Sequence, residues 1–431
     1  MVDGTIITEI PARASGQQSA LLMACEPIDT VRVAFVGIGS RGTSAVHRFT
    51  FQEGVRIAAL CDIEQERIDI NQKILSDAGL PAAREYIGEH AYEDLCKADD
   101  IDLVYIATDW RYHVPVALCA MENGKHAAIE VPSAMTLKDC WDLIDASERT
   151  RRHCICLENC CYDFFEATCL NMARKGLFGE IYHVEGAYIH NLAPYWKTYH
   201  DLWRTKYNRD YRGDNYPTHG FGPIAQVLNL HREDLMTTLV SMDTRSFMGL
   251  EYAKRTLNDS TMTSYANGDH TISLIGTEKG KLIEIQHNVC ANRPYSRMYQ
   301  LTGTRGFANK YPAQGILVQN NPFKLMEKNG GHENCLPKEQ FDSLMIAYKP
   351  DYIKEIEDKA RKVGGHGGMD FIMDYRLIYS LRNGLPMDID VYDLAEWCCV
   401  QELSRLSLEN GSAPVQVPDF TRGDWKKVRT Y

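Results

Sequence analysis

The chain has 431 residues, of which 44% are hydrophobic and 24% charged, and its formal net charge is −11. This length suffices for two or three domains with well-buried cores. The acidic balance argues against nucleic acid as a partner, and without a basic run or a bilayer-spanning apolar stretch we expect no membrane partner either.

The 14 cysteines do not form the C-x-x-C pairs of a zinc site, and the chain is too long for a disulfide scaffold. We interpret them as buried, reduced thiols and expect no metal. The first 27 residues lack a basic segment followed by an apolar core, so no secretory signal is recognised. We therefore expect a cytoplasmic protein, with periplasmic export left open. Residues 1–29 are expected to form an N-terminal extension, loose and polar over residues 10–19.

Residues 30–160 show the alternation of strands and helices that is typical of a dinucleotide-binding Rossmann domain. Predicted helices lie between the strands, for example at 115–123, closed by Gly124. The strands are predicted from apolar runs, which suit a parallel sheet covered on both faces. These runs lie at 31–36, 56–61, 103–107, 126–130 and 154–159.

A glycine-rich turn follows the first predicted strand and opens the next helix. Its pattern, Gly-x-Gly-x-x-Gly, is formed by Gly37, Gly39 and Gly42 and lets the backbone approach a pyrophosphate. Asp62 lies 20 residues past Gly42, where an acid accepts hydrogen bonds from the adenosine ribose. An acid there favours NAD because it repels a 2′-phosphate, although Arg41 in the turn can also tolerate NADP. The alternative is a structural glycine turn in an unrelated α/β domain.

Residues 161–431 are expected to form a second, α+β domain. Long alternating segments joined by glycine-containing turns predict a large, open, mostly antiparallel sheet with one face on helices. A helix is predicted from 164 to 175, and two more are predicted within 370–409. The last two can pack back against the first domain. Residues 303–365 give no clear pattern. The alternating segments lie at 181–190, 235–247, 271–275, 282–287 and 299–302.

Polar and aromatic residues follow the predicted strands of the first domain, where ligands bind in such sheets. They read Thr108-Asp-Trp110-Arg-Tyr-His113, Glu130-Val131-Pro132 and Glu158-Asn159. Trp110 can pack on a ring face, and His113 can donate a hydrogen bond to a carboxamide or a ribose. Glu130 is expected to contact the ribose or the nicotinamide. The alternatives are a capping loop with an incidental aromatic and a solvated loop acid.

These strand ends resemble the glucose–fructose oxidoreductase/inositol dehydrogenase family, which carries Thr-Pro-x-x-x-His and Glu-Lys-Pro segments. Here Asp109 replaces the proline and Val131 replaces the lysine. In the dehydrogenases of that family, the lysine amine helps to move the hydroxyl proton as hydride leaves. A valine cannot transfer protons, so the replacement favours a different reaction.

Further segments are similar to one branch, the NAD-dependent glycosidases of glycoside hydrolase family 109, known as α-N-acetylgalactosaminidases. Two specific ones are Tyr216-Pro-Thr-His219-Gly and Gly364-Gly-His366-Gly-Gly-Met-Asp370. The resemblance runs from about Val31 to past Asp370. It implies that NAD is contacted by Ser40, Arg41, Asp62, Trp110, Arg111, Tyr112, His113, Glu130, Val131 and Asn159. It also implies that the sugar is held by Tyr188, Arg204, Tyr216, Pro217, Thr218, His219 and Tyr295.

Two of these residues suit proton transfer. Pro217 fixes φ and starts a helix, so His219 lies near its positive end, which favours a neutral imidazole that can act as a base. Tyr188 shares a strand face with His190, and the missing lysine favours its hydroxyl as a proton carrier. The alternatives are a capping histidine and a packing tyrosine.

Three other residues have both a functional and a structural interpretation. Arg204 can fork onto sugar oxygens or pair with an acid such as Asp201. Tyr295 can stack on the substrate or be a loop aromatic. His366, among four glycines, suits the mouth of a pocket, but such turns also occur for structural reasons, so it is not included among the predicted site residues.

The resemblance implies a redox route to glycoside cleavage, instead of the usual pair of carboxylates. C3 of the sugar is oxidised by tightly held NAD⁺, a base removes the C2 proton, and the aglycone leaves C1. Water then adds, and the same cofactor returns the hydride, so the configuration at C1 is retained and no NADH accumulates. His219 and Tyr188 are the candidates for the proton transfers, with their individual roles left open.

Two other functions remain open from the sequence. One is a plain NAD-dependent sugar or inositol dehydrogenase, which would accumulate NADH. The other is a non-catalytic protein that binds NAD or a sugar. The partner is in each case a small molecule or a glycan terminus, and the exposed face of the second sheet predicts a homo-oligomer.

Overall fold

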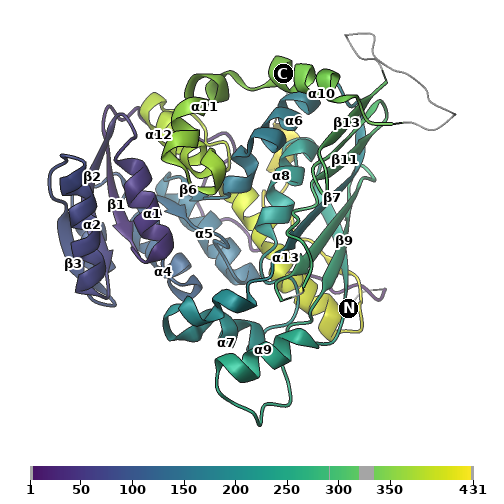
Figure 1. Ribbon diagram of the computed structural model, residues 1–431, viewed down its shortest axis with the longest axis horizontal. Helices are drawn as coiled ribbons and strands as arrows, with labels where there is room; N and C mark the ends of the chain where they lie inside the picture. Colours follow the sequence, from purple (N-terminus) through teal and green to yellow (C-terminus); the bar gives the residue numbers. More distant parts are fainter. Residues whose placement is uncertain (1–2, 291, 320–333, 429–431) are drawn as a thin grey trace.

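The computed structural model describes residues 3–290, 292–319 and 334–428, and it contains two β-sheets with helices packed between them (Figure 1). The first sheet has six parallel strands in the order β3-β2-β1-β4-β5-β6. The second has eight, in the order β13-β12-β11-β7-β10-β9-β8-β14, and only its β7–β10 pair is parallel. The predicted fold class, a Rossmann domain followed by an α+β domain with a large and mostly antiparallel sheet, is confirmed.

Most strands of the first sheet are short apolar segments with buried side chains, whereas the edge strand β3 is polar and largely exposed. The strands of this sheet are β1 (Val31–Val36), β2 (Val55–Asp62), β3 (Arg84–Ile87), β4 (Leu103–Ile106), β5 (His126–Ile129) and β6 (Cys154–Cys156). The helices that cover it are α1 (Ser40–Phe49), α2 (Gln65–Asp77), α3 (Ala91–Lys97), α4 (Trp110–Glu122) and α5 (Leu137–Thr150).

Two predicted boundaries in this domain were wrong. Helix α4 begins at Trp110 rather than at Pro115, because the side chain of Asp109 accepts the backbone N–H of Arg111 and caps the helix. Strand β6 ends at Cys156, and Asn159–Tyr162 form a short 3-10 helix. The first error matters most for the site, since Trp110 and His113 lie on a rigid helical turn instead of a loop.

The second sheet alternates buried and exposed side chains, as expected for a sheet with one covered face. Its strands are β7 (Ile181–Ile189), β8 (Met236–Asp243), β9 (Thr271–Thr277), β10 (Leu282–Asn288), β11 (Gln300–Gly303), β12 (Gly306–Asn309), β13 (Gly315–Val318) and β14 (Val415–Gln416). The helices of this half are α6 (Phe164–Arg174), α7 (Trp203–Asp210), α8 (Thr218–Leu228), α9 (Met248–Thr256), α10 (Lys338–Tyr348), α11 (Asp351–Val363), α12 (Met369–Asn383) and α13 (Val391–Glu409).

Part of this half had no predicted structure or was predicted differently. Within residues 303–365, strands β12 and β13 extend the sheet and helices α10 and α11 follow, while residues 320–333 lie outside the described part. The strand predicted at 235–247 ends at Asp243, and helix α9 begins at Met248.

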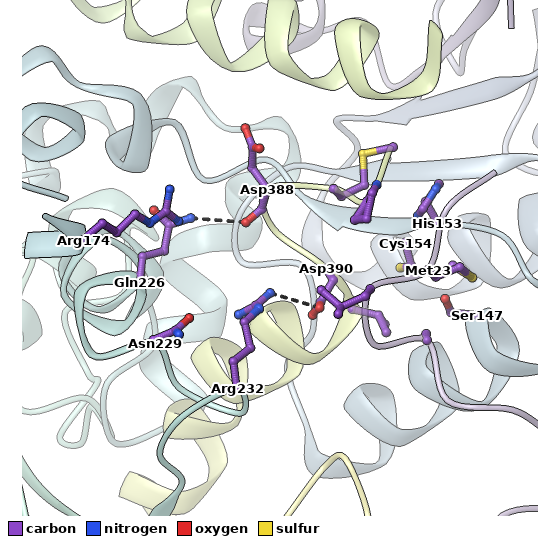
Figure 2. A pocket seen from close by; sticks show the side chains of 15 residues that line it. Met23, Ser147, His153, Cys154, Arg174, Gln226, Asn229, Arg232, Asp388 and Asp390 are labelled. Atoms are coloured by element: carbon purple, nitrogen blue, oxygen red, sulfur yellow. Dashed lines mark hydrogen bonds and ion pairs between the residues drawn. The ribbon is translucent and has the colours of Figure 1, made fainter. Parts of the chain in front are cut away.

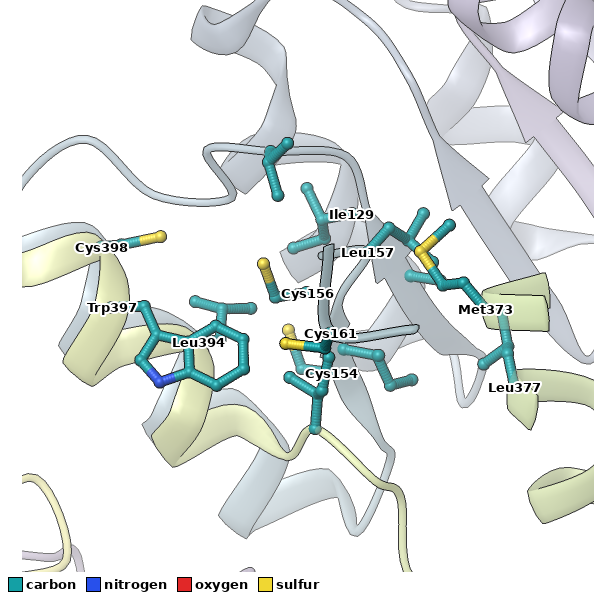
Figure 3. Packing of buried hydrophobic residues seen from close by; sticks show 14 of the residues in the cluster. Ile129, Cys154, Cys156, Leu157, Cys161, Met373, Leu377, Leu394, Trp397 and Cys398 are labelled. Atoms are coloured by element: carbon teal, nitrogen blue, oxygen red, sulfur yellow. The ribbon is translucent and has the colours of Figure 1, made fainter. Parts of the chain in front are cut away.

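Helices α12 and α13 connect the two halves of the molecule. The side chain of Arg48 in α1 donates to Asp374 in α12 at 2.6 Å, and both are buried. Figure 3 shows the thiols of Cys156 and Cys161 beside Trp397 of α13, in a packed apolar layer. All 14 cysteines are free thiols; eleven of them are buried, as interpreted, whereas Cys25 and Cys119 are partly buried and Cys335 is exposed. None of the described helices is both long and apolar enough to cross a membrane.

The N-terminal extension is held more firmly than predicted. The guanidinium of Arg13 donates to Glu148 in α5 and to Asp424 near the C-terminus, and the backbone of Ala20 donates to the Tyr392 hydroxyl. The expectation of a loose segment at residues 10–19 was therefore wrong, since these long-range partners are invisible in the segment's own composition. Beyond it, Met23 lines a polar cavity of about 200 Å³ with the Arg232–Asp390 ion pair (Figure 2).

Candidate active site

The glycine-rich turn between β1 and α1 has the shape that a pyrophosphate requires. Gly37 has a φ of +81°, and a Cβ there would lie 2.5 Å from the backbone nitrogen of Thr108. A Cβ on Gly42 would lie 2.1 Å from the carbonyl oxygen of Gly37. Helix α1 begins at Ser40 with neither a side-chain cap nor an acid in its first turn, so its N–H groups are available to an anion. The residues present therefore fit a dinucleotide.

Asp62 lies at the end of β2 beside this turn. Its carboxylate accepts the backbone N–H groups of Ile38, at 2.8 Å, and Glu64, at 3.1 Å, which fixes it at the place expected for the ribose contact. Arg67, not Arg41, is the guanidinium next to it, at 3.4 Å. The 2′ position of a bound adenosine ribose would therefore face both the Asp62 carboxylate and the Arg67 guanidinium.

Arg41 instead joins the two halves of the molecule. Its guanidinium donates to Glu130, at 2.7 Å, and to Asp370 at the start of α12, at 2.6 Å. Asp370 also accepts the side-chain amide of Asn159, at 2.5 Å, and lies 2.9 Å from Nδ1 of His366. Burial alone would raise the pKa of Asp370, but the charge of Arg41 and the hydrogen bond to His366 hold it well below the usual range.

The predicted segment Trp110 to His113 forms the first turn of α4 and points in several directions. Both ring nitrogens of His113 face backbone carbonyls, of Pro132 at 2.9 Å and of Thr108 at 3.1 Å. Burial lowers the pKa of this histidine. Arg111 pairs with Asp109, and Tyr112 donates to Glu89. Of these four residues, Trp110 is the one whose ring lies beside Tyr216.

Strand β7 and helix α8 approach each other closely because both carry a glycine at the contact. A Cβ on Gly186 would lie 2.1 Å from the carbonyl oxygen of Gly220. This approach brings Tyr188 of β7 beside His219 in the first turn of α8, with ring centroids 5.1 Å apart. Tyr216, just before α8, lies 4.8 Å from Tyr188 and 5.0 Å from His219. The predicted catalytic pair is thus close in space.

The His219 ring is oriented by a buried carboxylate. Its Nδ1 lies 2.7 Å from Oε1 of Glu158, which is fully buried beyond the end of β6. Burial would raise the pKa of Glu158, but the adjoining His219 ring lowers it. Because an ionised carboxylate only accepts, Nδ1 carries the hydrogen and Nε2 is the free ring nitrogen.

Arg204 is a buried cation without a carboxylate partner among the described residues. Its guanidinium lies 4.7 Å from the ring centroid of Tyr216 and 5.2 Å from that of Trp110, and it donates to the hydroxyl of Tyr199 at 3.0 Å. The predicted alternative, a pair with Asp201, is not formed, since Asp201 pairs with Lys206. A buried charge that has only aromatic neighbours favours polar oxygens of a ligand as its remaining partners.

Tyr188 is connected to Tyr295 through His190. The Tyr188 oxygen lies 3.1 Å from Nδ1 of His190, whose ring lies 5.0 Å from that of Tyr295. Burial raises the pKa of Tyr188, although the charge of Arg204 opposes it. Burial also lowers the pKa of His190, as do the charges of Arg204, His219 and His366. At neutral pH the phenol therefore keeps its hydrogen and the imidazole can accept it.

Of the remaining predicted residues, Val131 precedes Pro132 in a cis peptide, Pro217 caps α8 and Thr218 is fully buried in its first turn. Glu158, Asp370 and His190 were not predicted as site residues, and His366 was left out of the predicted site. Glu158 was visible as a strand-end acid, and His190 as the next residue on the face of Tyr188. Asp370 gave no signal beyond its place after the glycine-rich motif.

The fold, the glycine-rich turn and Asp62 define an enzyme of the class built on an NAD-binding Rossmann domain. Residues 31–157 match the oxidoreductase family with an NAD-binding Rossmann fold, and residues 162–427 match the C-terminal domain of glycosyl hydrolase 109. The chain belongs to glycosyl hydrolase family 109, and the resemblance in the sequence is confirmed.

Curated relatives cover almost the whole chain. A glycosyl hydrolase family 109 protein 1 from Phocaeicola vulgatus is 55% identical over 427 residues, which are 98% of this chain and 90% of that protein. Another from Bacteroides thetaiotaomicron is 55% identical over 432 residues, 99% of this chain and 92% of that protein.

Solved structures share the fold at low identity. A levoglucosan dehydrogenase in complex with NADH and levoglucosan has a TM-score of 0.64 and 14% identity, covering 90% of this chain and all of its own. The myo-inositol dehydrogenase of Lactobacillus casei, in complex with NAD(H) and myo-inositol, has a TM-score of 0.58 and 16% identity, covering 91% of this chain and 99% of its own.

Proposed function

We propose that this enzyme is an NAD-dependent retaining glycosidase that acts on α-N-acetylgalactosaminides through transient oxidation of C3. The observation that carries the proposal is the cluster of proton-handling side chains around Tyr188 and His219, combined with a valine where the related dehydrogenases use lysine. NAD supplies the hydride acceptor and donor of this chemistry. The protein supplies the groups that bind the sugar and move its protons.

The tyrosine relay serves the sugar hydroxyl that is oxidised. The Tyr188 oxygen can accept that hydroxyl's proton while its own hydrogen passes to Nδ1 of His190, 3.1 Å away. No charge then remains on the phenol, whose buried position disfavours the phenolate. The Tyr188–His190 pair thus performs the proton transfer that the lysine amine performs in the related dehydrogenases and that Val131 cannot perform.

The His219–Glu158 pair serves the C2 proton. Nε2 of His219 is the free nitrogen, and Glu158 stabilises the imidazolium that forms when this nitrogen takes the proton. His366 is a second imidazole whose Nδ1 is held by a carboxylate, Asp370, and its side chain is 59% exposed. This exposure suits a group that donates a proton to the leaving oxygen and then receives one from water.

Arg204 is the residue that we assign to sugar recognition. Its buried guanidinium has donors left for substituent oxygens, and Trp110 and Tyr216 supply ring faces beside it. The choice of N-acetylgalactosamine as the sugar rests on the family resemblance.

Tight retention of NAD is part of the proposal, since the cofactor must survive the whole cycle. It is supported by the ion pairs of Arg41 with Glu130 and Asp370, which connect the glycine-rich turn to the start of α12. The free thiols support a reducing, cytoplasmic location, which cell fractionation tests.

We also propose that two copies associate through the uncovered face of the second sheet. Strand pairing puts Met242, Leu274 and Leu282 on one face, and these side chains are 69%, 43% and 43% exposed. Such exposed apolar groups favour an interface. Light scattering is expected to show a dimer or larger assembly that Met242→Asp with Leu274→Asp dissociates. A wild-type monomer at micromolar concentration contradicts this.

The decisive experiment uses the purified protein as isolated, without added cofactor, and a panel of aryl hexosides. We expect release of the aglycone from the α-N-acetylgalactosaminide, no accumulation of NADH, and solvent deuterium at C2 of the liberated sugar. Denatured protein should yield NAD. Accumulation of NADH with an oxidised sugar would instead establish a dehydrogenase, and binding without turnover would establish a non-catalytic protein.

A further inference from the structure

A cleft of about 530 Å³ lies beside the active site, between the first domain and helix α7. Its first-domain wall comes from the outer surface of α4 and from the beginning of α5. Its other wall comes from α7 and the residues flanking it. The lining residues include Trp110, Trp203, Tyr207, Tyr211, Met135 and Lys206.

Flat aromatic rings form the floor of this cleft. The ring of Trp110 lies 4.8 Å from that of Trp203 and 5.2 Å from that of Tyr207, and Tyr207 stacks on Tyr211 with centroids 4.3 Å apart. Tyr211 is 44% exposed, so this ring reaches solvent. The exposed ring of Tyr211 suits the C–H face of a pyranose ring, which can stack on it while the hydroxyls stay free to form hydrogen bonds.

The backbone before α7 is strained so as to present these rings. Asp201 and Leu202 both have left-handed φ values, of +50° and +52°, which non-glycine residues rarely adopt. Two such residues in succession cost free energy and occur mainly where a site requires them. They set the direction in which Trp203 enters the cleft.

Three of the four carboxylates that line the cleft are paired with a cation, and the fourth, Asp139, accepts the backbone N–H groups of Met135 and Thr136. Asp142 pairs with Lys138 at 2.5 Å, Asp201 with Lys206 at 2.7 Å and Asp210 with Arg209 at 2.6 Å. The three paired carboxylates therefore offer little net attraction to a cation, but their remaining lone pairs can accept hydrogen bonds from hydroxyl groups. Aromatic faces together with neutralised carboxylates fit a neutral sugar better than a charged ligand.

The cleft adjoins the sugar-binding part of the active site at Trp110, which lines the cleft and also lies against Tyr216 and Arg204. Trp110 contacts Trp203 in the cleft and Tyr216 in the active site, where the ring centroids are 5.9 Å apart. Arg204 follows Trp203 directly in the chain and lies against Trp110. A ligand in the cleft therefore lies one aromatic side chain away from the reacting sugar.

We propose that this cleft is a second carbohydrate-binding site, which holds a neutral sugar of the glycan whose terminal residue is cleaved. The proposal rests on the proposed function for the identity of the ligand. It makes Tyr211 and Trp203 determinants of preference for extended glycans over simple glycosides.

The test compares Tyr211→Ala with two other variants. Tyr211→Phe keeps the ring face, and Tyr195→Ala removes a tyrosine that is 55% exposed and lies outside the cleft. The probes are an aryl α-N-acetylgalactosaminide, a neutral trisaccharide ending in the same sugar, and the disaccharide that remains after its removal. Calorimetry measures binding of the disaccharide, and kcat/KM is measured for the two glycosides.

Loss of the stacking ring in Tyr211→Ala is expected to weaken disaccharide binding about threefold to tenfold. It should lower kcat/KM for the trisaccharide by the same factor while leaving the aryl glycoside unchanged. Tyr211→Phe and Tyr195→Ala should behave like the wild type.

Equal disaccharide binding by the wild type and Tyr211→Ala, or no binding by either, overturns the second site. So does an equal loss of kcat/KM for the trisaccharide and the aryl glycoside, because Tyr211 then acts on the reacting sugar and not on a second one. If no glycoside is cleaved, the proposed function fails, and disaccharide binding still decides whether the cleft binds sugar.

Discussion

The two halves of the active site treat charge in opposite ways. On the cofactor side, Arg41 is matched by Glu130 and Asp370, and Arg48 by Asp374, so that buried charges meet across the two halves of the molecule. On the sugar side, the guanidinium of Arg204 lies against the rings of Trp110 and Tyr216 and donates to the Tyr199 hydroxyl, and it has no ion pair within the described residues. Asp214, just before Tyr216, is a buried carboxyl without an ion-pair partner among the described residues.

This difference shows which groups are structural and which await a ligand. A matched buried pair is costly to break, because removing one partner leaves an uncompensated charge. An unmatched buried group has an incomplete set of partners that a substrate can supply. The cofactor side is therefore expected to respond to mutation through retention of NAD, and the sugar side through catalysis.

The largest expected effect is on the sugar side. His219→Ala removes the proposed C2 base and should lower kcat about 10²- to 10⁴-fold. It should leave the bound nucleotide in place, because the ring partners of His219 are Tyr188, Tyr216 and Glu158, outside the cofactor turn. Aglycone release and the nucleotide content of denatured protein measure the two effects.

Glu158→Gln tests the same proton transfer more gently than His219→Ala. The amide keeps the shape of the Glu158 side chain but loses the charge that stabilises the His219 imidazolium. We expect a smaller loss in kcat, of about tenfold, and a pH–rate profile displaced from that of the wild type. Full activity of His219→Ala would remove this residue from the mechanism. An unchanged profile in Glu158→Gln would reduce Glu158 to a packing role.

The second effect is on the cofactor side. Asp370→Asn removes the carboxylate that Arg41, Asn159 and His366 share, and it should weaken NAD retention about tenfold to a hundredfold. The variant should lose nucleotide on gel filtration, and added NAD should restore only part of its activity, because His366 also loses its Asp370 partner. An exposed control, Asp69→Asn on α2, should retain NAD. Retention equal to that of the wild type would show that the Arg41 ion pair does not hold the cofactor.

The features predicted correctly from the sequence are those written in neighbouring residues. The glycine turn, Asp62 and the start of α8 at Thr218 each follow from local backbone rules. The alternating segments revealed the second sheet because one face is buried. Local patterns of this kind do not depend on the rest of the chain.

The features that were missed depend on contacts between distant segments. Asn159 and Asp370 are 211 positions apart, and Arg41 and Asp370 are 329 apart. No periodicity encodes such a meeting. The helical start at Trp110 was missed for another reason: its cap is local, since the Asp109 carboxylate accepts the backbone N–H of Arg111, but this acid was not interpreted as a helix cap.

The last effect concerns Asp214, and it tests the sugar side through stability instead of activity. This carboxyl accepts the backbone N–H of Tyr216 at 3.1 Å, and burial raises its pKa to about 7. An unfolded aspartate has a pKa of about 3.9, so between these values the native state binds more protons than the unfolded state. The contribution of Asp214 to stability therefore falls as pH rises from about 4 to 7, by about 1.4 kcal/mol per unit.

Asp214→Asn removes this titration, because an amide does not ionise. The free energy of unfolding of the variant, relative to the wild type, should increase steadily over that pH window and level off above it, as urea titrations at several pH values can measure. Asp69→Asn should show no such trend. A constant difference between Asp214→Asn and wild type would mean that Asp214 is ionised throughout and has a partner at its carboxylate after all, and the two halves of the site would then treat buried carboxylates alike.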